Sequence, residues 1–146
     1  MAPGNRLLLR LMNPLLLTLL LVAAIPASAE KPGVAVHLDE LEHMNRALRQ
    51  IERQREAAPG LPIHVIMVAG AVHALIDGSK DENGGLFSAQ LEQLLAQDIR
   101  LFACLNTLDA FNKTEDDLSL GVETVRSGVA ALTDRQLNDG FAYIKL

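Results

Sequence analysis

Cysteine is nearly absent from this 146-residue chain, which has a single one, Cys104. One cysteine excludes an internal disulfide, the usual reason for cysteine in an exported chain. A free cysteine is often a small buried hydrophobe, but it can also join two chains or act as a reactive thiol. The count alone leaves these three alternatives open.

Sequence motifs for nucleotides, metals and hydrolysis are also missing. No GxGxxG or Walker A pattern occurs, and Asn83-Gly84-Gly85 reads more simply as a flexible loop than as a backbone nest for phosphate. None of the four histidines (His37, His43, His64 and His73) forms a helical i, i+4 metal pair. No GxSxG elbow is present, and a Cys-His hydrolase built from Cys104 with His37 or His73 would lack an evident third group to orient the histidine. We therefore expect no cofactor and no bound metal.

Long apolar runs are confined to the N-terminus. Arg6 and Arg10 precede an apolar run over 15–25, and Ala27 and Ala29 then provide the small-x-small pattern of a cleavage site. This order predicts a secretory signal peptide over residues 1–29 and one domain over residues 30–146. We expect the mature protein to be periplasmic, although other secreted destinations fit the same pattern. We also expect no stable membrane insertion after cleavage.

The alternative at the N-terminus is an uncleaved anchor. Leu7 to Leu9 could extend the apolar run backwards, but Asn13 and Pro14 interrupt that extension. The uninterrupted run is shorter than the ~20 residues that a membrane-spanning helix needs. Cleavage is therefore the favoured interpretation.

A surplus of basic charge is missing too. Without the predicted signal and its two arginines, the chain has 11 basic and 18 acidic residues, a net charge of −7. An acidic chain of this kind does not favour contacts with phosphate backbones, so we expect no nucleic-acid partner.

Apolar runs in the remaining chain alternate with helical patterns. Strands are predicted at 34–38, 63–68, 99–104, 122–125 and 141–144, with helices or turns between them. Such alternation predicts a three-layer α/β/α fold of the flavodoxin/Rossmann-like kind, with a mainly parallel sheet of about five strands. We expect Asp39, Ser88 and Ser127 to cap helices, and Gly140 to end the last one. The polar segment 77–85 is predicted to be a mobile loop.

Cys104 has the most suggestive surroundings of any residue. It ends the third predicted strand, and ligands bind at the carboxyl ends of strands in such sheets. A helix is predicted to start directly after it, where backbone N–H groups and the helix dipole favour an anion. The pKa of a thiol at such a position can fall well below its free value. Asn106 and Thr107 are candidates to stabilise an anionic sulfur.

Three segments resemble the DsrE/DsrF-like sulfur-relay family. The segment 102–108 (FACLNTL) is similar to the family's cysteine motif, and 68–72 (VAGAV) is similar to its VxHGxxV segment. The segments 125–130 and 137–144 resemble its closing pattern, SGVxEL followed by LQxxGYAYI. The resemblance runs from about 34 to 144, which is nearly all of the mature chain.

The resemblance implies a sulfur carrier that assembles as a homo-oligomer, such as a trimer or hexamer, with Cys104 holding sulfur as a persulfide. Passing this sulfur on would require a partner protein with its own thiol. Gly70 would allow close backbone approach to the site. Ala69 stands where many relatives have histidine, so His73 or His37 would have to replace that group. The alternative function is a non-catalytic oligomeric binding or scaffold domain with a buried cysteine.

Overall fold

The computed structural model describes residues 31–146, so the predicted signal peptide lies outside the described residues. The elements follow one another in the order β1 (Val34–Leu38), α1 (Met44–Ala57), β2 (Ile63–Met67), η2 (Ala69–Leu75), α2 (Phe87–Leu95), β3 (Ile99–Cys104), α3 (Leu105–Ala110), η3 (Glu115–Asp117), β4 (Glu123–Val125), α4 (Gly128–Leu137) and β5 (Ala142–Lys145). Here η denotes a 3-10 helix.

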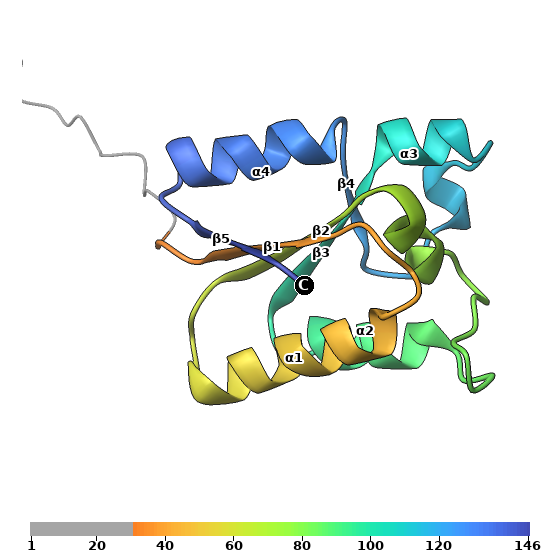
Figure 1. The fold of residues 1–146 in the computed structure, drawn as a ribbon, viewed down its shortest axis with the longest axis horizontal. Helices are drawn as coiled ribbons and strands as arrows, with labels where there is room; N and C mark the ends of the chain where they lie inside the picture. The colour runs from red at the N-terminus through yellow and green to blue at the C-terminus, as the bar shows by residue number, and fades with distance from the viewer. Residues whose placement is uncertain (1–30) are drawn as a thin grey trace, which may run out of the picture.

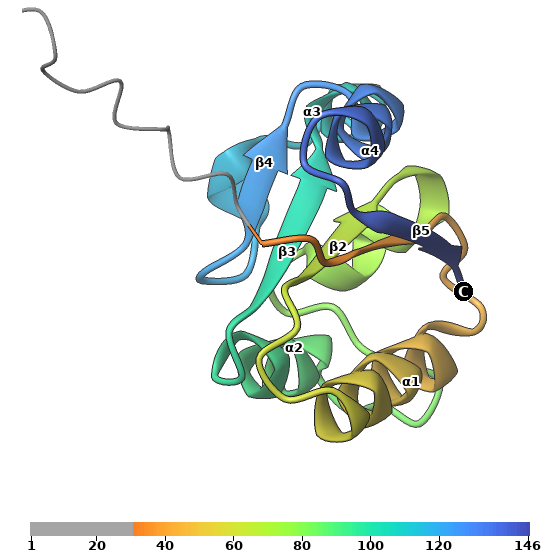
Figure 2. The same ribbon diagram turned by 90° about the vertical axis from the view of Figure 1, so that its left-hand side faces the viewer.

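The described strands form one five-stranded sheet in the order β4-β3-β2-β1-β5, and every pairing is parallel. Helices α1 and α2 cover one face, while α3 and α4 lie on the other side (Figure 1). The predicted three-layer α/β fold with a parallel sheet is therefore confirmed. A view turned by 90° shows α4 above the sheet and α1 below it (Figure 2).

The sheet has an apolar core on each face. The larger core joins inward residues of α1 and α2 to one face of the central strands. The smaller core lies under α4 and contains Ala35, Ile66, Phe102, Leu132 and Phe141. Consecutive residues of a strand point to opposite faces, so β2 must be apolar on nearly every position to fill both cores. Burying each large aliphatic side chain contributes roughly 2 kcal/mol to the hydrophobic stabilisation.

Two of the predicted helix caps are wrong. Helix α1 starts at Met44, its N-cap residue is His43, and no side chain caps it; the carboxylate of Asp39 pairs with Lys145 at 2.6 Å. Ser88 lies inside α2, which begins at Phe87. Ser127 does cap α4, since its hydroxyl accepts a hydrogen bond from the Ala130 N–H.

Turn geometry modifies two further expectations. The segment Ala69–Leu75 after β2, one of the helices or turns expected between strands, is a 3-10 helix. Gly140 has φ of 70°, the left-handed conformation expected after a helix, but it comes two residues after the C-cap Asn138. In the polar loop 77–85, the Asp81 carboxylate accepts hydrogen bonds from the side-chain amide of Asn45 and from the backbone N–H groups of Asn83 and Gly85.

Among residues 31–146, no helix combines the length and apolarity needed to cross a membrane.

Candidate functional site

Cys104 is the last residue of β3 and the N-cap residue of α3. It lies at the carboxyl edge of the parallel sheet, as the sequence predicts. Its side chain is on the α4 face, because Phe102, two residues earlier, belongs to the core under α4. The residue is buried, with 5% of its surface exposed. The thiol therefore lies beneath the start of α4 and beside the start of α3.

The sulfur of Cys104 lies at the starts of two helices and accepts a hydrogen bond from the first turn of α4. The Gly128 N–H, in the first turn of α4, points at Sγ with a nitrogen–sulfur distance of 3.3 Å. The Thr107 hydroxyl and the backbone N–H groups of Thr107 and Asn106, at the start of α3, also lower the pKa of the thiol, although the Asn106 N–H is bonded to the Arg126 carbonyl at 3.3 Å. These groups carry the partial positive charge of the two helix N-termini, which favours a thiolate.

Burial and hydrogen bonding act in opposite directions on the Cys104 thiol. Burial raises its pKa by disfavouring the charged form. The hydrogen bond from Gly128, followed by those from Thr107 and Asn106, lowers it. The hydrogen bonds prevail, so the pKa of the thiol lies below its ordinary value.

Thr107 is held in place by an unusual backbone conformation. Ala69 has φ of 45°, in the left-handed region that alanine rarely adopts. In this conformation its N–H donates to Thr107 Oγ1 at 3.2 Å. The hydroxyl oxygen is thus occupied as an acceptor, which leaves its hydrogen available for the sulfur. Ala69 is also the position at which the family pattern has histidine.

His37 and His73, the two histidines considered as replacements, have other partners. His37 Nδ1 is 2.8 Å from the Tyr143 hydroxyl, and burial lowers the pKa of this imidazole. His73 is exposed and stacks on Phe111, with 4.3 Å between ring centroids. No hydrogen bond found among the described residues joins either ring to Cys104, so their roles in the site stay predictions.

Gly70 lies against a different part of the chain from Cys104. A Cβ added there would meet the Asp39 carbonyl at 3.4 Å and the Leu41 nitrogen at 3.6 Å, with no atom of Cys104 inside 4 Å. The close approach at this glycine is therefore to the loop that follows β1.

Gly128 is the site residue that sequence reasoning missed. Its contact with Cys104 spans 24 positions and requires α4 to begin over the end of β3. The available signal was its place three residues after the fourth predicted strand, within the family-like segment 125–130.

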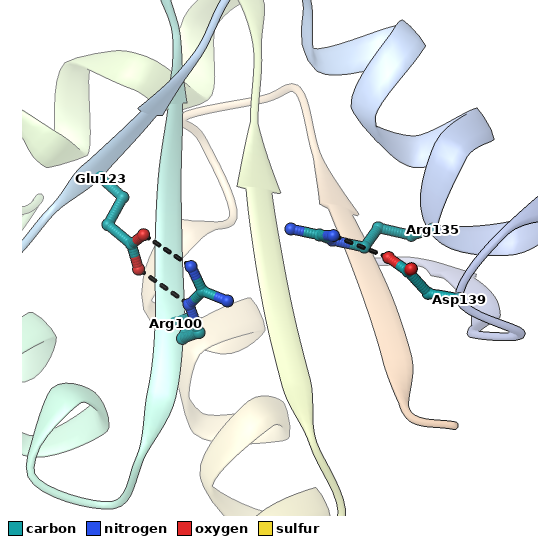
Figure 3. Close-up of polar contacts among 4 residues, drawn as sticks. All are labelled: Arg100, Glu123, Arg135 and Asp139. Atoms are coloured by element: carbon teal, nitrogen blue, oxygen red, sulfur yellow. Dashed lines mark hydrogen bonds and ion pairs between the residues drawn. The ribbon is translucent and has the colours of Figure 1, made fainter. Parts of the chain in front are cut away.

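A polar cluster occupies the opposite end of the same sheet face. Arg100 makes two hydrogen bonds to Glu123, of 2.8 and 2.6 Å, and Arg135 pairs with Asp139 at 2.7 Å (Figure 3). Both guanidinium groups also lie over the Phe102 ring. Arg100 and Glu123 join β3 to the short edge strand β4, so this cluster is best explained as structural support.

Metal ligands do not gather in the described part of the chain. Residues 31–146 contain no group of three or more histidine, cysteine, aspartate or glutamate side chains placed to hold an ion.

Comparison with known proteins identifies the family. The described fold is a single-cysteine α/β domain whose thiol lies at the carboxyl edge of a parallel sheet. The model of the DsrE/DsrF-like family matches residues 36–146, and the chain belongs to this family.

Solved structures share the fold. A protein of unknown function from Methanobacterium thermoautotrophicum, MTH1491, is 32% identical, with a TM-score of 0.67 over 80% of this chain and 100% of that one. The YchN protein of E. coli is 22% identical, with a TM-score of 0.64 over 80% of this chain and 99% of its own. No curated protein sequence matches the chain significantly.

Proposed function

We propose that this protein is an exported sulfur carrier that holds sulfane sulfur as a persulfide on Cys104. The observation that carries this proposal is the 3.3 Å hydrogen bond from the Gly128 N–H to Sγ, made where α3 and α4 both begin. Groups that stabilise a thiolate also stabilise a persulfide anion, which carries the same charge on one further sulfur atom. Membership of a sulfur-relay-type family supports the same function.

Each hydrogen-bond donor near Cys104 has its own role in this function. The Gly128 N–H and the start of α3 stabilise charge on Sγ, and the Thr107 hydroxyl supplies a hydrogen bond through a side chain. A thiolate is the form that attacks a sulfane sulfur. A lowered pKa increases the fraction of Cys104 in that form near neutral pH.

The carrier would act outside the cytoplasm and as a homo-oligomer. Export is supported by the signal-like sequence over residues 1–29. Self-association is supported by exposed apolar side chains on α4 and β5, where Val129, Leu137 and Tyr143 are 66%, 78% and 44% exposed. A protein with a reactive thiol would then collect the sulfur.

The second candidate function is an oligomeric binding or scaffold domain with an inert cysteine. The 5% exposure of Cys104 favours it, because a thiol shielded from reagents carries no sulfur.

Thiol titration of the mature protein separates the two functions. We expect Cys104 in the folded protein to react with a small thiol reagent faster than free cysteine does at pH 7, because its pKa is lowered. The Cys104→Ala variant should not react at all. A thiol that reacts only after denaturation would instead support the scaffold function.

A further inference from the structure

Two valines flank Cys104 on the α4 face of the sheet. Cys104 pairs directly with Val125 of β4. On its other side, the register that pairs Met67 with Ala103 places Val68 next to Cys104. Neighbouring strands are about 4.8 Å apart, so a valine on each side leaves little lateral space at the sulfur. Both valines also pack against the small core under α4.

The first turn of α4 lies over Val68 and Cys104. A Cβ added to Gly128 would lie 2.2 Å from Val68 Cγ1 and 3.5 Å from Cys104 Cβ. The Gly128 backbone is therefore packed directly on the valine and the cysteine. This packing covers the thiol from the α4 side, consistent with the 5% exposure of Cys104.

The groups around the Cys104 thiol suit a small anion. The sulfur accepts a hydrogen bond from the Gly128 N–H at 3.3 Å, and the start of α3, which carries Thr107, follows Cys104 directly. The nearby charges of Asp109 and Arg126 pair with each other at 3.3 Å. A negatively charged ligand thus meets donors at the sulfur and a balanced pair of charges beside it.

We infer that Val68, Val125 and the α4 start form a size filter, and that the sulfur donor is a small inorganic polysulfide anion. This inference rests on the proposed sulfur-carrier function and specifies its substrate class. The Cys104 thiolate attacks one end of the polysulfide chain. A sulfur–sulfur bond forms at Cys104, and one bond of the donor breaks. The donor leaves as a dianion shorter by one sulfur, so charge and electrons balance without a further reactant.

Two neutral probes of different size test the filter on the mature protein. Methyl methanethiosulfonate is small, and dithiodipyridine is a bulky aromatic disulfide. For each thiol, the rate with the bulky probe is divided by the rate with the small probe. We expect this ratio to be at least about tenfold lower for the folded protein than for N-acetylcysteine, because access limits thiol reactions. Val68→Ala should remove most of this difference, and Val125→Ala, on the edge strand, should act in the same direction.

Val65→Ala is the matched control. It makes the same truncation on β2, but Val65 belongs to the core on the opposite face. This control should keep the discrimination of the parent. The filter would be overturned if the ratio of the two probe rates were the same for the parent protein as for N-acetylcysteine, or if Val65→Ala changed this ratio as much as Val68→Ala does. Either result would leave the proposed carrier function standing. Failure of even the small probe to modify the folded protein would overturn the carrier function itself.

Discussion

At the scale of single residues, the chemistry of Cys104 depends on which groups donate to its sulfur. Burial alone would make this thiol a poor nucleophile, since it raises the pKa. Backbone N–H groups reverse that effect without introducing a cationic side chain. A fixed donor also loses less conformational entropy on binding than a lysine or arginine would. The hydrogen bonds thus favour the thiolate more than burial alone would.

Replacing Thr107 tests the one side-chain donor. In Thr107→Val the hydroxyl is lost and the Ala69 N–H loses its acceptor, so the pKa of Cys104 should rise toward its ordinary value. Because the thiolate is the reactive form, alkylation slows as the pH falls through this pKa. We expect a rate at pH 7 that is lower by about three- to tenfold, with the midpoint of the pH profile moved upward.

The Thr107→Ser variant is the control, because serine retains the hydroxyl. Its pH profile should overlap that of the parent. A midpoint unchanged in Thr107→Val would refute the role given to this hydroxyl.

Sequence reasoning located the cysteine but not its principal donor. The family-like segment 102–108 identified Cys104, and local helix signals identified Thr107. Gly128 was missed because the path of α4 over β3 depends on strand order, which local apolar patterns do not encode. Asp39 was misassigned as a cap for a related reason, since its partner Lys145 is 106 positions away.

At the scale of elements, α4 links the stability of the fold to the site. It begins at Gly128, whose N–H donates to the sulfur of Cys104, and its packing closes the smaller core. Its N-terminus is fixed by the Ser127 hydroxyl, immediately before the residue that donates to the sulfur. The apolar runs predicted the three central strands because helices cover both of their faces.

Ser127→Ala should destabilise the protein by about 1 kcal/mol, because the N-cap acceptor for the Ala130 N–H is lost. Urea denaturation measures the change. Ser88→Ala provides the comparison, since Ser88 lies inside α2 and caps nothing. It should change stability by less than about 0.5 kcal/mol. Equal losses in both variants would contradict the capping role of Ser127.

At the scale of the whole molecule, one side of the sheet ends in an open edge. All four residues of β5 are exposed, and Leu137 of α4 is nearby in sequence and 78% exposed. Exposed edges and apolar side chains of this kind favour association. This surface is the reason to expect an assembly instead of a monomer.

We expect sedimentation analysis of the mature protein to give a mass above that of a monomer. Leu137→Glu should shift the distribution toward monomers, because it places a charge in an apolar contact. Gln136→Glu adds the same charge at the adjacent exposed position and should leave the assembly unchanged. A parent protein that sediments as a monomer would contradict the proposed assembly.

The most direct test of the sulfur-carrier function is the intact mass of the mature protein after incubation with polysulfide, measured with and without reductant. The account predicts a gain of one sulfur atom that reductant removes and that Cys104→Ala lacks. An unchanged mass on folded protein, or an equal gain in Cys104→Ala, would contradict it.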